Sequence, residues 1–313
     1  DGNIAPWLRF ASALGGTGGH VFVFCSGFGL YLSYLHHPVT FGEFMKRRFL
    51  KIYVPYLIFL LIHSFLPHWG TDTETQIRYL LSHVFLYKMF YEKYICSFGL
   101  QFWFISTIIQ LYFLFIPLCR LREKTSLKTM VLTSLAVSLF WWTVMYLTGR
   151  EALRIWGSFC LEYIWEFALG MAAAEYMMNR EEAQIPAWGL PVAAVCGLGL
   201  QVLMQIQGGI LRAWNDIPAL IGYASMVLLL FRYGKHILRP IFLRLDKISY
   251  EIYLVHDDGI KFGFYYSWLW IRDTTMIGAM FGTLLTLVSA CILKLISDLV
   301  LRRLRGGRNT TGA

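Results

Sequence analysis

Charged residues are scarce in this sequence. Asp, Glu, Lys and Arg make up 15% of its 313 residues, whereas hydrophobic residues make up 57%. Soluble domains carry about 25% charged residues, so this chain has too few of them to cover a surface exposed to water. The composition excludes an ordinary soluble enzyme. It is typical of a polytopic membrane protein, in which each helix needs roughly 20 mostly apolar residues to cross the hydrocarbon.

Two kinds of local motif are also missing. None of the six cysteines has CxxC spacing and five lie in apolar runs, so we interpret them as small buried hydrophobes rather than a disulfide or zinc framework. The glycines at 15–19 precede an apolar run and lack the following Lys-Ser/Thr of a phosphate-binding loop. We expect no metal and no bound cofactor. We also expect no nucleic-acid partner, because Lys and Arg at span ends account for most of the net charge of +9.

Apolar runs of membrane-spanning length recur along the chain. They predict an all-α, polytopic transmembrane bundle with one domain over 1–313. This domain would include an extracytoplasmic lead-in at 1–19, an extracytoplasmic segment at 67–101 and a tail at 301–313. The nine predicted spans lie near 20–36, 51–66, 102–119, 129–148, 157–177, 187–206, 217–232, 249–271 and 276–300.

Basic residues orient these spans. Eighteen Lys and Arg fall in alternate links and in the tail, against nine on the opposite side. The positive-inside rule places the richer set, including the C-terminal tail, in the cytoplasm. Nine spans leave the first residues outside, and the sequence does not begin with Met. We therefore expect a tenth helix upstream, which would place both termini in the cytoplasm.

Four stretches in order resemble motifs of the acyltransferase-3 family of integral membrane acyltransferases. "GGTGGHVFVFCSGFGL" resembles the family's second helix, and "FMKRRFLKIYVPY" its basic motif and proline at the third. "QFWFISTIIQLYFLFIP" resembles its Trp-Phe helix, and "ISYEIYLVH" its Ser-Tyr signature near the C-terminus. Together the four motifs cover residues 15 to about 300.

The resemblance implies a bacterial inner-membrane enzyme that moves an acyl group, most often acetyl from acetyl-CoA, onto a hydroxyl of an extracytoplasmic glycan or lipid-linked sugar. Membrane lipid, acyl-CoA and the acceptor would then be its partners. The alternative is a polytopic exporter of glycan or lipid intermediates without acyl chemistry. A transporter would more often show an internal repeat, and none is evident in the sequence.

The chain departs from the family's pattern in two places. The family's Arg-x-x-Arg here ends in Lys51, which keeps the charge but loses the bidentate fork of Arg. The family's first helix carries an Arg and, after ten intervening residues, a His thought to be catalytic. Arg9 and His20 have this spacing, but four glycines and Thr17 between them disfavour a span. We therefore expect the catalytic His upstream and keep Arg9 and His20 out of that role.

Basic residues at the start of the second predicted span are the candidates for binding CoA. Arg48 and Lys51 share a helix face at i, i+3, beside Arg47. They would bind the CoA phosphates. The alternative is a topology anchor whose side chains reach the lipid headgroups.

Polar residues near the C-terminus form a second candidate set. Ser249, Tyr253 and His256 recur at i, i+4 and i+7 on one helical face. His256 is a candidate base or a helix-bridging residue, and both roles stay open. From the resembling motifs we add Tyr250 and Trp103 to Ser249 and Tyr253 as substrate candidates.

Two carboxylates lie one turn apart in the fifth predicted span. Glu162 and Glu166 are costly inside a membrane, so we consider Glu162 a substrate residue and Glu166 a catalytic candidate, with a neutral bridging acid as the alternative. Lys294 and Asp298, at i, i+4, predict an internal ion pair. Residues 77–91 predict an amphipathic helix that lies along the membrane surface or enters an acceptor cleft.

Overall fold

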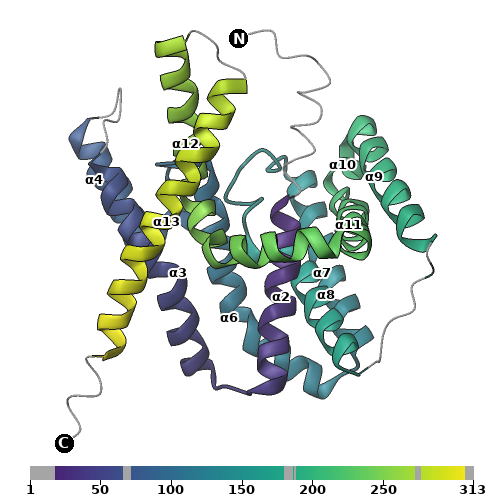
Figure 1. The fold of residues 1–313 in the computed structure, drawn as a ribbon. Helices are drawn as coiled ribbons and strands as arrows, with labels where there is room; N and C mark the ends of the chain where they lie inside the picture. Colours follow the sequence, from purple (N-terminus) through teal and green to yellow (C-terminus); the bar gives the residue numbers. More distant parts are fainter. Residues whose placement is uncertain (1–17, 66–71, 180–185, 187, 272–275, 307–313) are drawn as a thin grey trace, which may run out of the picture. The chain divides into compact units, whose positions relative to one another are not determined.

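The computed structural model describes residues 18–65, 72–179, 186, 188–271 and 276–306. Every regular element among them is a helix, which confirms the all-α prediction for this part of the chain (Figure 1). The long helices are α2 (Gly18–His36), α3 (Phe41–Ser64), α6 (Trp103–Lys124), α7 (Leu127–Leu147), α8 (Cys160–Asn179), α9 (Gly189–Gln207), α11 (Asp216–Leu245), α12 (Ser249–Ile271) and α13 (Met276–Gly306). The short ones are α4 (Thr73–Val84), η2 (Tyr87–Phe90), α5 (Glu92–Ile95), η3 (Leu100–Phe102), α10 (Gly209–Ala213) and η4 (Asp246–Ile248).

Each predicted span coincides with one long helix, although some ends differ. α3 begins ten residues before the predicted span, since the basic segment is itself helical, and α11 runs past 232 to Leu245. Five segments of the described chain are long and apolar enough to cross a membrane. They are Leu100–Lys124, Leu127–Leu147, Gly189–Gln207, Gly209–Tyr265 and Ile277–Leu304. The count of nine spans stays a prediction.

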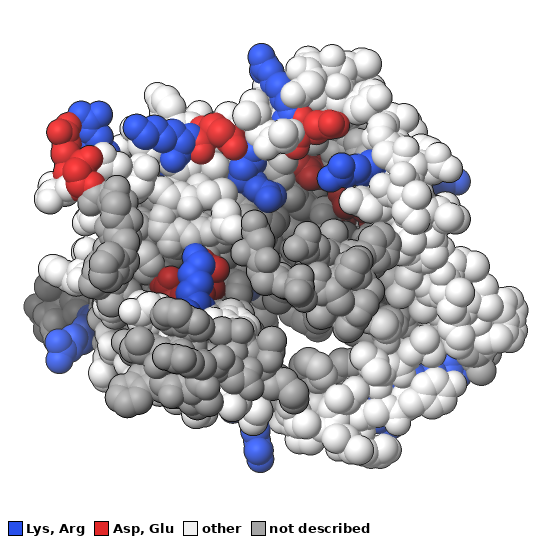
Figure 2. Space-filling model, turned by 90° about the horizontal axis from the view of Figure 1, so that it is seen from above, with Lys and Arg blue, Asp and Glu red and all other residues white. Residues whose placement is uncertain are grey.

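The surface matches a hydrocarbon environment. On the face drawn in Figure 2, charged side chains are sparse among uncharged ones. α9 and α13 expose large apolar side chains, including Val195, Leu203, Met280 and Leu295. Such a surface is costly in water but is the surface a helix needs in lipid. The chain is a multi-pass membrane protein.

The chain forms two compact units, each built from separate stretches of sequence. Unit 1 comprises Asp1–Phe41 and Thr107–Arg239, and unit 2 comprises Gly42–Ser106 and Pro240–Ala313. Three helices, α3, α6 and α11, therefore contribute residues to both units, α3 only through Phe41.

Close backbone packing of α2 against α8 is central to unit 1 (Figure 1). A Cβ added at Gly27 would overlap the Phe167 carbonyl, and one added at Gly170 would overlap the Phe24 carbonyl. Only glycine permits this approach, which small residues commonly provide between membrane helices. The contact fixes the register of α2 on α8 and hence the positions of the polar side chains on both helices.

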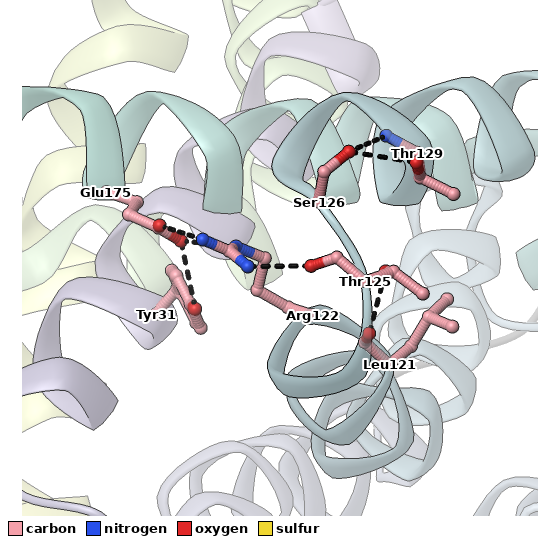
Figure 3. Close-up of polar contacts among 7 residues, drawn as sticks. All are labelled: Tyr31, Leu121, Arg122, Thr125, Ser126, Thr129 and Glu175. Atoms are coloured by element: carbon pink, nitrogen blue, oxygen red, sulfur yellow. Dashed lines mark hydrogen bonds and ion pairs between the residues drawn. The ribbon is translucent and has the colours of Figure 1, made fainter.

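A charged cluster joins the opposite ends of these helices to α6 (Figure 3). The Arg122 guanidinium donates two hydrogen bonds to the Glu175 carboxylate, at 2.9 and 2.5 Å, and the Tyr31 hydroxyl donates to the same carboxylate at 3.2 Å. A third donor of Arg122 bonds the Thr125 carbonyl at 2.7 Å. Bidentate pairs of this kind impose geometry as well as adding energy, so the cluster holds α2, α6 and α8 together at one end.

Unit 2 is organised around α12. α12 packs on α13, where Gly263 and Gly282 bring the two backbones into contact. The Tyr250 hydroxyl donates to the Ile52 carbonyl of α3 at 2.9 Å, and the Gln101 amide donates to the Leu254 carbonyl at 3.2 Å. α12 therefore lies beside α3 and η3.

Candidate functional site

A buried histidine lies between two carboxyl groups in unit 1. His20, in the first turn of α2, is 7% exposed. Its Nδ1 lies 2.5 Å from a carboxyl oxygen of Glu166 on α8, and its Nε2 lies 3.3 Å from a carboxyl oxygen of Asp216 at the start of α11. The Tyr163 ring packs on the imidazole at 5.1 Å between centroids. We call His20, Glu162, Glu166 and Asp216 the His20 centre.

Three carboxyl groups share the His20 centre with one imidazole. Glu162 lies one turn before Glu166 and interacts electrostatically with His20 and Asp216. Arg154 also interacts electrostatically with Glu162, and these groups must balance one another because an uncompensated buried charge is very costly. The carboxyl groups at both ring nitrogens therefore hold the imidazole of His20 in one orientation.

Indole groups surround the carboxyl groups. Trp165 precedes Glu166, and Trp214 lies two residues before Asp216; both belong to an aromatic cluster with Trp142. The indole N–H groups of Trp142, Trp165 and Trp214 are buried without a hydrogen-bond partner among the described residues, as is one carboxyl oxygen each of Glu162 and Glu166. Buried indole N–H groups usually find a partner. The cluster therefore offers unused donors and acceptors next to the His20 centre.

The basic candidates lie on the first half of α3. Arg47 and Lys51 are exposed and Arg48 is half-buried. Lys51 interacts electrostatically with Arg48 and with Lys294 of α13. Lys294 forms the predicted contact with Asp298, at 3.1 Å, and also lies 3.7 Å from Glu251. The structure thus adds a fourth cation, Lys294, to the predicted cluster of Arg47, Arg48 and Lys51.

The candidates on α12 and α6 bond the backbone instead of converging on a shared point. The Ser249 hydroxyl donates to the Asp246 carbonyl, and the Tyr253 hydroxyl donates to the Gln101 carbonyl. His256 Nδ1 bonds the Tyr253 carbonyl of its own helix at 2.7 Å. Tyr250 bonds α3 as described above, and Trp103 is half-buried at the start of α6 with its ring edge against Phe104.

The sequence pattern identified only part of these arrangements. Glu162 and Glu166 were recognisable as carboxyl groups inside an apolar span, and the structure brings both to His20. Asp216 was not recognised, although an acid at the start of a predicted span next to Trp214 was a usable signal. A histidine–carboxylate pair in unit 2, His63 with Asp258, was missed too. Arg9 and the expected upstream His lie outside the described residues.

Comparison with known families agrees with the motifs. The family model described as "Acyltransferase domain" matches residues 1–295. The chain belongs to this family, the acyltransferase-3 family, and is an acyltransferase. Comparison with curated proteins and with solved structures gave no match.

Proposed function

We propose that the enzyme transfers acetyl from acetyl-CoA to a hydroxyl of an extracytoplasmic glycan or lipid-linked sugar, in the bacterial inner membrane, and that the His20 centre takes up the hydroxyl proton. The observation that carries the proposal is the buried imidazole with a carboxyl group at each ring nitrogen. The sequence analysis kept His20 out of the catalytic role, and its buried position between two carboxyl groups is the reason for proposing that role here.

The chemistry requires a base at the acceptor. As the hydroxyl oxygen attacks the thioester carbonyl, the new C–O bond forms, the C–S bond breaks and the hydroxyl proton must leave. His20 accepts this proton, while Glu166 and Asp216 orient the ring and stabilise the imidazolium that results. A positioned general base of this kind contributes about 10²–10⁴-fold to the rate.

The surroundings of the centre support a sugar as the acceptor. A sugar ring presents several hydroxyl groups on an otherwise apolar face. The indole rings of Trp142, Trp165 and Trp214 supply apolar surface and N–H donors, and the unpartnered oxygens of Glu162 and Glu166 supply acceptors. Ligand sites combine apolar walls with a few placed polar groups in this way.

The basic cluster supports CoA as the donor. Arg48, Lys51 and Lys294 concentrate positive charge at one end of α3, and charge-assisted hydrogen bonds to phosphate oxygens are strong. Glu251 and Asp298 balance part of the charge through Lys294. Arg47 and Arg48 supply guanidinium groups, whereas Lys51 acts as a point charge.

The proposal is tested with membranes that contain the full-length protein and acetyl-CoA labelled in its acetyl group. We expect label to appear in an extracted glycan or lipid-linked sugar, and His20→Gln to lower transfer by about 100-fold or more. His36→Gln, at the exposed far end of α2, is the matched control and should transfer normally. Full transfer by a folded His20→Gln protein contradicts the role of His20. A wild-type protein that transfers no label favours the exporter.

A further inference from the structure

The segment between α7 and α8 carries an arginine stacked on two tryptophans. The guanidinium of Arg150 lies 4.6 Å from the centre of the Trp156 ring. That ring stacks in turn on Trp141 of α7, with 4.8 Å between centroids and 14° between planes. The Trp141 indole N–H donates to the Trp156 carbonyl at 3.2 Å and so holds the two residues together. A guanidinium that stacks through its face keeps the N–H donors at its edge for other partners.

The backbone that carries Arg150 is fixed by the end of α7. Gly149 has a φ of 64°, which glycine adopts without strain, and its N–H donates to the Tyr146 carbonyl at 3.1 Å. The N–H of Arg150 then donates to the Met145 carbonyl at 2.9 Å. These two bonds form a Schellman motif, which ends a helix with a defined geometry. The chain therefore leaves α7 in a fixed direction, which places Arg150 on the Trp156 ring.

The guanidinium of Arg150 has no anionic partner within the part of the chain that the structure describes. Its side chain is exposed and makes neither an ion pair nor a hydrogen bond there, although Glu151 is its neighbour in the sequence. Arg122 of the same unit, in contrast, binds both carboxyl oxygens of Glu175. An exposed, stacked guanidinium with unused donors has the geometry that binds a carboxylate or a phosphate through two parallel hydrogen bonds.

This arginine stack is connected to the His20 centre through Gly157, the residue after the stacked tryptophan. The Gly157 carbonyl accepts a hydrogen bond from the Tyr163 hydroxyl at 2.9 Å. The Tyr163 ring packs on the imidazole of His20, as described above. Arg154, in the same segment, interacts electrostatically with Glu162 of the centre. All of these residues belong to unit 1, so the stack and the centre form one continuous set of contacts.

We propose that Arg150 binds an anionic group, a carboxylate or a phosphate, on the sugar acceptor. The inference deepens the proposed function and rests on it, because it takes the acceptor to react at the His20 centre. The edge of the guanidinium holds two oxygens of the anion, and Arg154 adds a second positive charge to the same segment. A neutral sugar leaves the donors of Arg150 without a partner, so the acceptor of this enzyme is an acidic sugar.

The decisive experiment measures sugar binding by the purified full-length protein without an acyl donor. The probes are glucuronic acid and glucose 6-phosphate, with glucose as the neutral match. We expect the wild-type protein to bind at least one acidic sugar about 10- to 100-fold more tightly than glucose, because hydrogen bonds to charged groups are the strong ones. The acidic sugar that binds more tightly shows whether the anion is a carboxylate or a phosphate.

Substitutions of Arg150 separate an anion site from a membrane anchor. Arg150→Gln should bind all three sugars with about the affinity that the wild-type protein has for glucose. Arg150→Lys keeps the charge but loses the planar fork, so we expect it to recover only part of the preference. An arginine that only anchors the segment at lipid headgroups predicts equal affinities for the three sugars in the wild-type protein and in both variants, and that result overturns the proposal.

A control variant and the transfer assay keep the outcomes distinct. Arg212→Gln changes an exposed arginine of α10 in the same unit, and it should keep the preference for acidic sugars. If wild-type membranes transfer label to a glycan but the protein shows no such preference, only this inference falls. A preference for acidic sugars without any transfer of label overturns the proposed function and leaves Arg150 as an anion-binding residue of an exporter.

Discussion

At the scale of single residues, Lys88 occupies the least favourable environment for its charge. Its side chain is fully buried, and its Nζ donates to the Phe102 carbonyl at 2.6 Å. The rings of Tyr56 and Phe102 lie 5.7 and 5.6 Å from Nζ and partly replace the lost water. Burial nevertheless lowers the pKa of Lys88 from its ordinary 10.5 to about 7.

This burial predicts a pH-dependent stability. Between pH values of about 7 and 10.5, the unfolded chain binds a proton at Lys88 that the folded chain does not. Raising the pH through this window therefore increases the free energy of unfolding. We expect the thermal midpoint of the purified protein to rise from pH 7 to pH 9, and Lys88→Met to remove the rise. Lys93→Met, which changes an exposed neighbouring lysine, should keep the rise in the thermal midpoint. An unchanged rise in Lys88→Met would show that other groups cause the pH dependence.

Single residues also show how far a sequence can predict a site. The cost of carboxylates in an apolar span identified Glu162 and Glu166 without knowledge of their partners. The pairings themselves join residues 146 positions apart in His20–Glu166 and 195 apart in His63–Asp258. Local spacing contains no information about such contacts. Spacing selected His256 instead, whose Nδ1 bonds its own helix.

At the scale of elements, the packing of α2 on α8 depends on which face of α2 each glycine occupies. Gly27 touches the Phe167 backbone, whereas nothing lies within 4 Å of a Cβ added at Gly29. We expect Gly27→Ala to destabilise the protein by about 1–3 kcal/mol, since a rigid backbone must move, and Gly29→Ala to be neutral. Thermal midpoints in detergent measure the difference. Equal midpoints for the two variants would contradict the close approach.

The helices themselves were largely predictable. Each apolar run forms a helix because a backbone in hydrocarbon must satisfy its hydrogen bonds internally. The ends were less predictable: hydropathy falls where α11 becomes charged near Arg232, yet the helix continues to Leu245. Hydropathy also does not report the division into two units, because neither unit is a continuous stretch of sequence.

At the scale of the whole molecule, binding of the donor can be tested apart from catalysis. Changing Arg48 and Lys51 together to Gln removes two charges from the basic cluster on α3. We expect affinity for CoA to fall by about 100-fold or more, because each hydrogen bond to a charged group contributes about 1.5–3 kcal/mol and about 1.4 kcal/mol is tenfold. Binding of CoA to the purified protein measures the change.

The matched control for this double variant is Lys46→Gln, which changes an exposed cation five residues before Lys51. It should bind CoA with normal affinity and insert normally. Wild-type affinity in a correctly inserted Arg48→Gln/Lys51→Gln protein would remove these residues from the donor site.

The separation of His20 from its partners has a consequence for biosynthesis. Glu166 is made 146 residues after His20, which at about 5–20 residues per second is a delay of roughly 7–30 s. Asp216 follows later still. During this interval a nascent α2 holds an imidazole that has no carboxylate, close to the translocation channel. Wild type and Glu166 variants are the same chain during this interval, so we expect any loss of yield in a Glu166 variant to begin only after α8 has been made.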